Sequence, residues 1–101
     1  MSRAAIGYRP TRLTRPKRVR AASGLGDTML RFMAASAGYQ MVDIVHGFDD
    51  EHAAIDVLMD LVAARAASAI FVEGGRAAFS DDKNRDILAC RCQAVGVQLF
   101  D

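Results

Sequence analysis

The stretch AIFVEGG, residues 69–75, decides the fold class. Its first four residues form a brief, continuous apolar run, which is the pattern of a strand covered on both faces. Gly74-Gly75 then ends the run. Sheets covered on both faces are typically parallel, and parallel strands must be joined by crossovers, usually helices. We therefore expect a strand at 69–72 inside a layered α/β fold.

Outward from this strand, the apolar pattern alternates between strand and helix along the whole chain. We expect strands at 4–9, 41–46, 69–72 and 97–100, and helices at 24–37, at 50–66 and from 80–82 to just before Gly96. The order predicts one small three-layer α/β domain over residues 1–101, with a four-stranded, mostly parallel sheet. The residues expected to face the core are Leu30, Met33, Ala34 and Ala37, then Ile55, Leu58, Met59 and Val62, then Ile87, Leu88 and Cys92. The methionines at 29, 33, 41 and 59 are expected to fill gaps in the core.

Charge is distributed unevenly along the chain. Residues 1–20 carry seven Arg or Lys and no Asp or Glu, whereas the remaining 81 carry six basic and twelve acidic residues. A segment of charge +7 is thus attached to a body of charge −6, although the formal net charge is +1. The asymmetry indicates either an anionic partner for the segment or a segment that folds back onto its own acidic surface.

The basic segment begins where a ligand site is expected. In parallel α/β sheets, ligands lie beyond the carboxyl ends of the strands, and a basic loop at about 9–22 starts at that edge. We expect its basic residues, and one arginine after the third strand, to be nucleic-acid-binding positions. They are Arg9, Arg12, Arg15, Lys17, Arg18, Arg20 and Arg76.

Two other motifs favour structural interpretations. Gly24-Leu25-Gly26 stands at a helix start, but the dinucleotide pattern needs a third glycine where the chain has Met29, so no cofactor is expected. Cys90 and Cys92 supply two of the four ligands that a closed zinc site needs. We expect both to be small buried residues, and we expect no metal site.

His46, Asp49, Asp50 and His52 form the sequence's one cluster of histidines and carboxylates. Such a cluster could support metal ligation or acid–base chemistry. We favour the simpler interpretation, in which the two aspartates cap a helix and His52 is exposed in its first turn.

Thr11 and Thr14 are the hydroxyl residues beside concentrated positive charge at an expected strand end. An arginine-rich setting suits phosphoryl transfer, which depends on charge neutralisation and positioning. Neither threonine has an evident base in the sequence. We therefore expect no catalytic residues, with phosphoryl transfer on Thr11 as the less favoured alternative.

Four stretches, together with the order of elements, resemble the catalytic domain of serine recombinases of the resolvase and invertase type. They are IGYRPTR (6–12), AASAGYQMVDIVHG (34–47), AIDVLMDLVAARAASAIFVEGGR (54–76) and AVGVQLFD (94–101). The resemblance covers nearly the whole chain. It implies a resolvase-like fold with its site at the end of the first strand.

The family's catalytic pattern on that strand is Tyr-x-Arg-x-Ser. Tyr8 matches the tyrosine, but Pro10 and Arg12 stand at the arginine and serine positions. If one deletion is allowed, Arg9 and Thr11 fill those positions instead. The nucleophilic serine is missing in either alignment.

After the third strand the family has an Asp-Arg pair and a second arginine three residues later. Here Gly75 replaces the acid, Arg76 matches the first arginine and Phe79 replaces the second. We therefore expect no strand cleavage. The sequence also lacks the family's dimerisation helix and helix-turn-helix, so we expect no sequence-specific reading of DNA.

These observations predict a non-catalytic, recombinase-like domain whose basic loop contacts nucleic acid phosphates, without base specificity, or a recombinase-like partner. The alternative is an assembly module whose basic arm docks on an acidic surface of a second copy or another protein. This alternative expects the body to stay folded without residues 1–20. No run approaches bilayer length and no secretory signal is present, so we expect a soluble, cytoplasmic protein without a membrane partner.

Overall fold

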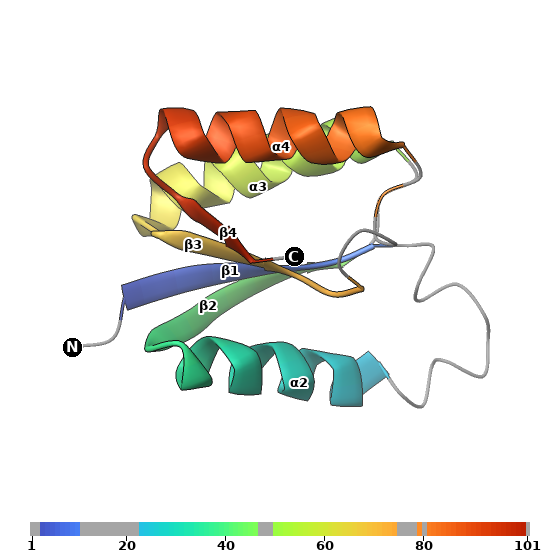
Figure 1. The fold of residues 1–101 in the computed structure, drawn as a ribbon. Coiled ribbons are helices and arrows are strands. Elements are labelled where there is room, and N and C mark those ends of the chain that lie inside the picture. The colour runs from blue at the N-terminus through green and yellow to red at the C-terminus, as the bar shows by residue number, and fades with distance from the viewer. Residues whose placement is uncertain (1–2, 11–22, 47–49, 75–78, 80, 101) are drawn as a thin grey trace.

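A computed structural model describes residues 3–10, 23–46, 50–74, 79 and 81–100. The strands are β1 (Arg3–Arg9), β2 (Tyr39–His46), β3 (Ala69–Val72) and β4 (Gln98–Phe100), and the helices are α2 (Ser23–Ser36), α3 (Glu51–Arg65) and α4 (Asp82–Ala94). All neighbouring strands pair in parallel, in the order β2-β1-β3-β4. The expected α/β class, element order and four-stranded parallel sheet are confirmed (Figure 1).

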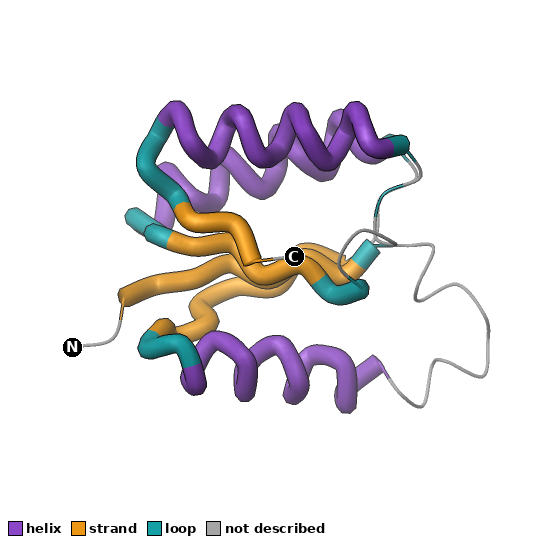
Figure 2. The backbone as a smooth tube through the Cα atoms, in the orientation of Figure 1, coloured by secondary structure: helices purple, strands orange, loops and turns teal. Residues whose placement is uncertain are grey.

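The expected element boundaries lie within two residues of those observed. Two helices begin directly after an aspartate whose carboxylate accepts backbone N–H groups of the first turn, Asp50 for α3 and Asp81 for α4. Gly38 and Gly96 follow α2 and α4 with φ of 87° and 74°, a conformation that favours glycine. Short turns therefore join each helix to the next strand at the amino edge of the sheet (Figure 2).

The helices are divided unequally between the two faces of the sheet. Among the described helices, α2 alone covers one face, whereas α3 and α4 share the other (Figure 1). From β1 the chain moves to β2 on one side of the sheet, and from β2 it crosses back to β3 on the other side of β1. Because each crossover is right-handed, two crossovers that run in opposite directions across the sheet place their helices on opposite faces. One core cluster accordingly lies under α3 and α4, around Ile6, Leu58 and Leu88, and a smaller one lies under α2, around Leu30 and Phe71.

An irregularity in β2 changes which of its side chains face α2. The pairing with β1 shifts between Ala5 and Ile6, so that Val42 is skipped in the register. Tyr39 and Met41 pack in the α2 cluster before this bulge, and Val45 packs in the opposite cluster after it. Because side chains alternate along a strand, the bulge places His46 on the α2 face.

Several residues expected in the core are instead exposed. On α2, Leu30 and Ala34 are buried, but Met33 is 42% exposed and Ala37 lies outside the core; Met29, expected to fill a gap, is 53% exposed. The buried stripe is narrow because no other described helix packs on this face beside α2. On α4, Ile87 is 37% exposed while Leu88 is buried. None of the helices in the described ranges combines the length and apolarity needed to cross a membrane.

Candidate functional site at the carboxyl edge of the sheet

The strand order creates a topological switch point between β1 and β3. The chain passes from β1 to β2 on one side, then crosses back to place β3 on the other side of β1. Ligands of open α/β sheets bind outside the carboxyl ends of the strands at such a point. Among the described residues, this edge carries Arg9 at the end of β1, His46 at the end of β2 and Glu73 after β3.

Arg9 is the buried centre of the edge, with only 2% of its side chain exposed. Its Nε donates to Glu73 Oε2 at 3.0 Å, and its Nη1 donates to Asp27 Oδ1 at 3.1 Å. One carboxylate comes from the end of β3 and the other from α2. Burying a charge is costly unless it is paired, so these contacts allow a guanidinium to sit between the sheet and α2.

Gly26 makes room for this arrangement. A Cβ built on Gly26 would overlap both the Arg9 guanidinium and the Glu73 carboxylate. The first turns of α2 therefore approach the ion pairs more closely than a side chain would allow. The Gly-Leu-Gly motif at this helix start thus has a packing role at its second glycine.

His46 extends the network toward solvent. Its Nε2 lies 2.8 Å from Oδ1 and 3.1 Å from Oδ2 of Asp27, and its side chain is 52% exposed. Asp27 thus bridges a buried arginine and an exposed histidine. A carboxylate that orients an imidazole can support proton transfer at the imidazole's other nitrogen.

The pKa of Asp27 reflects competing effects. Burial raises it, but the hydrogen bond and charge of His46, followed by those of Arg9, outweigh burial and lower the pKa below its usual value. Asp27 is therefore a carboxylate at neutral pH.

Tyr8 lies on the other face of β1, because neighbouring side chains in a strand point to opposite faces. Its ring packs against Phe79 with centroids 5.9 Å apart, within the α3 and α4 core. Its hydroxyl is buried without a hydrogen-bond partner among the described residues. Burial, and secondarily the charge of Glu51, raises the pKa of Tyr8 to about 12.

The predicted histidine and carboxylate cluster is divided. Asp50 caps α3 by accepting from the backbone N–H groups of His52 and Ala53, as expected, and His52 is exposed. His46 instead pairs with Asp27, which sequence reasoning did not single out. Asp49 lies outside the described residues. Within the described part of the chain, no group of three or more His, Cys, Asp or Glu is placed to hold a metal ion.

The two cysteines differ in environment. Cys92 is buried, and burial raises the pKa of its thiol to about 11. Cys90 is exposed, which corrects the expectation that both are buried. The difference follows from their spacing, because residues two apart on a helix point in different directions.

Among the predicted nucleic-acid-binding positions, the structure describes only Arg9. Its charge is neutralised by two carboxylates inside the protein, and its side chain is almost fully buried, so this arrangement does not present it to a phosphate. The other six positions lie outside the described residues, as do Thr11 and Thr14. They are Arg12, Arg15, Lys17, Arg18, Arg20 and Arg76.

Sequence reasoning missed Asp27, Glu73 and Gly26 as parts of one site. Glu73 follows a predicted strand and Asp27 belongs to a predicted helix start, so both could be assigned to the carboxyl edge. The contact of Glu73 with Arg9 depends on β1 and β3 being neighbours, and the contact of Asp27 with Arg9 depends on the packing of α2 against the sheet. The sequence reveals neither.

The fold and this site define a doubly wound, parallel α/β domain with a charged network at its switch point. No model of a protein family, no curated protein and no solved structure matches the chain significantly.

Proposed function

We propose that this protein is a non-catalytic α/β domain of recombinase-like type that binds nucleic acid phosphates through its basic segment. The observation that carries the proposal is the segregation of charge. Residues 11–20 contain five Arg or Lys and no Asp or Glu. The segment connects the carboxyl end of β1 to the start of α2, so both of its ends are attached at the ligand-binding edge.

The geometry of β1 supports a non-catalytic role. In the Tyr-x-Arg-x-Ser pattern the three named residues are two positions apart, so their side chains point to the same face of a strand. Tyr8 and Arg9 are adjacent and lie on opposite faces of β1. Arg9 therefore cannot join Tyr8 in a shared catalytic group, and its two carboxylate partners hold its charge inside the protein.

The composition of the segment supports contacts to phosphates over contacts to bases. Residues 10–22 contain no aromatic side chain on which a base could stack. Arginine and lysine bind phosphate oxygens without regard to sequence. Binding is therefore expected to be non-specific and strongly salt-dependent.

Duplex binding measured at several salt concentrations tests the proposal. Five phosphate contacts predict a slope of about −4.5 for log K against log salt. Changing Arg18 and Arg20 to Gln should make the slope about 1.8 units shallower. The matched control changes Arg65 and Lys83 to Gln, which alters net charge equally but should leave the slope unchanged. Absent binding, salt-independent binding or equal effects of both variants would contradict the proposal.

The acidic surface of α3 favours a second candidate, in which the basic segment docks on a protein. Residues 50–65 carry four acidic residues and one arginine, and Asp56, which pairs with Arg91, is 68% exposed. This candidate predicts self-association that weakens steeply with salt and is lost when the five basic residues of 11–20 are changed to Gln. An assembly that does not respond to these changes would contradict it.

A further inference from the structure

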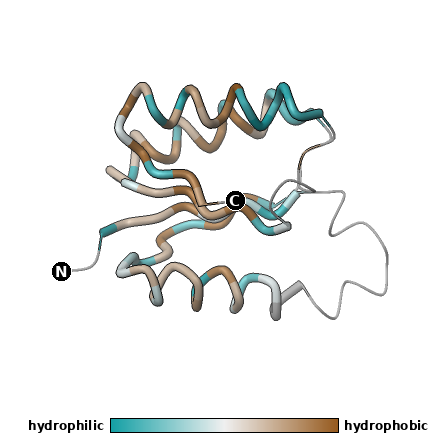
Figure 3. The backbone as a smooth tube through the Cα atoms, viewed as in Figure 1, coloured by the Kyte–Doolittle hydropathy of each residue, from teal (hydrophilic) through white to brown (hydrophobic). Residues whose placement is uncertain are grey.

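The α2 face of the molecule carries an unusual concentration of exposed apolar side chains. Phe32 is 67% exposed, Met29 53% and Met33 42%, all on one helix. Figure 3 shows α2 in mostly neutral and hydrophobic colours, whereas the first half of α4 is hydrophilic. Soluble proteins rarely leave contiguous apolar surface of this kind without a partner.

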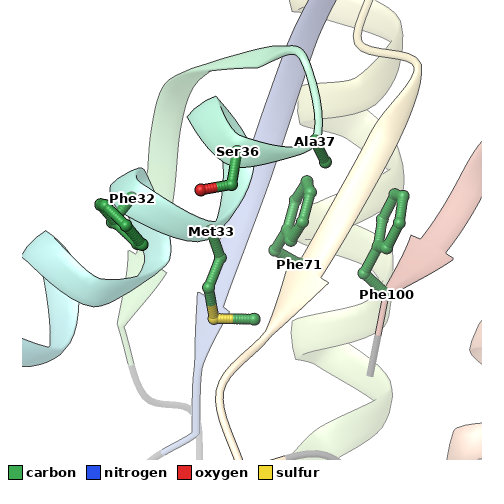
Figure 4. Close-up of a pocket in the computed structure, with 6 residues that line it drawn as sticks. All are labelled: Phe32, Met33, Ser36, Ala37, Phe71 and Phe100. Carbon is green, nitrogen blue, oxygen red and sulfur yellow. The ribbon is translucent and has the colours of Figure 1, made fainter.

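A groove lies beside these side chains, where α2 leaves β3 and β4 uncovered. It has a volume of about 480 Å³ and is lined by Phe32, Met33, Ser36, Ala37, Phe71 and Phe100 (Figure 4). The rings of Phe71 and Phe100 stack with centroids 4.4 Å apart and planes 3° apart, and form an aromatic wall. On the opposite face, α3 and α4 together cover the sheet, so the groove reflects the absence of a second helix from this layer among the described elements.

We propose that this face binds a second copy of the same chain, as a two-fold symmetric dimer in which each Phe32 enters the groove of its partner. Phe32 is mostly exposed and borders a hollow that is also lined by the rings of Phe71 and Phe100, so a projecting ring and a hollow share one surface. Such a surface is complementary to itself, which is the requirement of a two-fold interface. Phe and Met are also enriched at the centres of interfaces.

The charges of the face suit an identical partner better than a charged one. Helix α2 contains two charged residues, Asp27 and Arg31. Asp27 is engaged by Arg9 and His46, and Arg31 donates to the backbone oxygen of Met41. Two copies of this face can therefore meet with little electrostatic repulsion. A two-fold axis perpendicular to α2 would also make the two α2 helices, and hence their dipoles, antiparallel. Nucleic acid would find no matching charge here.

The area required is a modest share of the surface. A standard interface buries about 800 Å² of each partner, which is about 13% of the 6030 Å² that the chain exposes. Helix α2 alone is about 21 Å long over its 14 residues. The exposed side chains of α2 and the walls of the groove on β3 and β4 lie on the same face and can contribute to this area together.

Sedimentation equilibrium on the full chain over a range of concentrations tests the proposal. The wild-type chain should reach twice the monomer mass, and the dimer should persist at high salt, because burial of apolar surface does not depend on charge screening. Changing Phe32 to Gln should weaken dimerisation at least ten-fold, since the change occurs in both copies. Circular dichroism should show this variant folded, because Phe32 is mostly exposed.

Val95 to Gln is the matched control. Val95 is 60% exposed after α4, on the other helical layer, so its replacement removes exposed apolar surface, although less than that of Phe32, outside the face. A wild-type chain that stays monomeric, a dimer lost at high salt, or equal weakening by both variants would overturn the proposal. A dimer lost at high salt would indicate docking of the basic segment instead.

Discussion

Asp27 joins the buried and exposed halves of the charged network, because its carboxylate accepts from Arg9 and lies against His46. Its pKa is lowered in the folded protein, so the unfolded chain binds the proton more readily. The stabilisation is therefore present above the unfolded pKa of about 4 and is lost as pH falls through the lower folded pKa. The ion pair of Arg9 with Asp27 is then lost, whereas its ion pair with Glu73 remains.

Changing Asp27 to Asn should therefore destabilise the protein at neutral pH by about 1–3 kcal/mol. The difference from wild type should shrink as pH falls below about 4, because the unfolded wild-type chain then binds a proton that the folded protein binds only at lower pH. Urea unfolding at a series of pH values measures both effects. Asp86 to Asn is the control, because Asp86 is 72% exposed. An equal effect at every pH would count against the ionic role of Asp27.

Gly26 tests the packing of the same network. Alanine ordinarily stabilises a helix by about 1 kcal/mol relative to glycine. At Gly26 the added Cβ would collide with Arg9 and Glu73, whose charged groups are held by each other. Gly26 to Ala should therefore destabilise the protein by about 1–3 kcal/mol.

Ala35 to Gly supplies the reference for this change, since Ala35 is an exposed residue of the same helix. Thermal or urea unfolding should show alanine favoured at position 35 and glycine favoured at position 26. Alanine favoured at both positions would show that the ion pairs can move aside.

At the scale of elements, β1 limits which of residues 1–20 can be removed without unfolding the protein. Residues 1–20 include β1, which lies between β2 and β3 and pairs with both. The position of β1 argues against the expectation that the body stays folded without residues 1–20. Deletion of residues 1–9 should abolish cooperative unfolding, because the sheet loses an inner strand and two sets of backbone hydrogen bonds.

Circular dichroism and urea titration would measure this loss. The companion variant keeps β1 and changes the five basic residues of 11–20 to Gln, and it should unfold cooperatively like wild type. A folded product of the deletion would contradict the assigned role of β1.

The sequence predicted the elements well because each one is locally encoded. Residues 69–72 combine a continuous apolar run with a glycine stop, and Asp50 and Asp81 precede their helices as caps. The bulge at Val42 has no such signal, since Val42 fits a regular strand. It nevertheless decides that His46 faces Asp27. Local patterns therefore predicted the helices and strands, but not which side chains share a face.

At the scale of the whole molecule, the missed parts of the site share one cause. Arg9, Asp27 and Glu73 come from three elements that lie far apart along the chain. Their contacts require the strand order, which follows from global packing. Likewise, the apolar spacing of α2 predicted Met33 inside the core, where it would lie if a second helix covered β3 and β4.

The two proposals together predict the spacing of the basic segments in a dimer. Ser23, where each segment joins α2, lies nine residues from Phe32, or about 13 Å along the helix. In an antiparallel pair centred on Phe32, the two attachment points lie about 27 Å apart, which corresponds to about eight base pairs of duplex. A duplex well beyond that length could contact both segments, whereas a shorter one could contact a single segment.

Wild-type protein should therefore bind a duplex of about 24 base pairs more tightly than a duplex of about six base pairs. The difference in affinity should exceed the increase that the larger number of binding positions on the longer duplex gives by itself. Phe32 to Gln should lose this extra affinity on the long duplex and match wild type on the short one, because its basic segment is intact. Fluorescence anisotropy with both duplexes measures the difference. Equal binding of the long duplex by both proteins would contradict the dimer, whereas failure of both proteins to bind either duplex would contradict the phosphate-binding function.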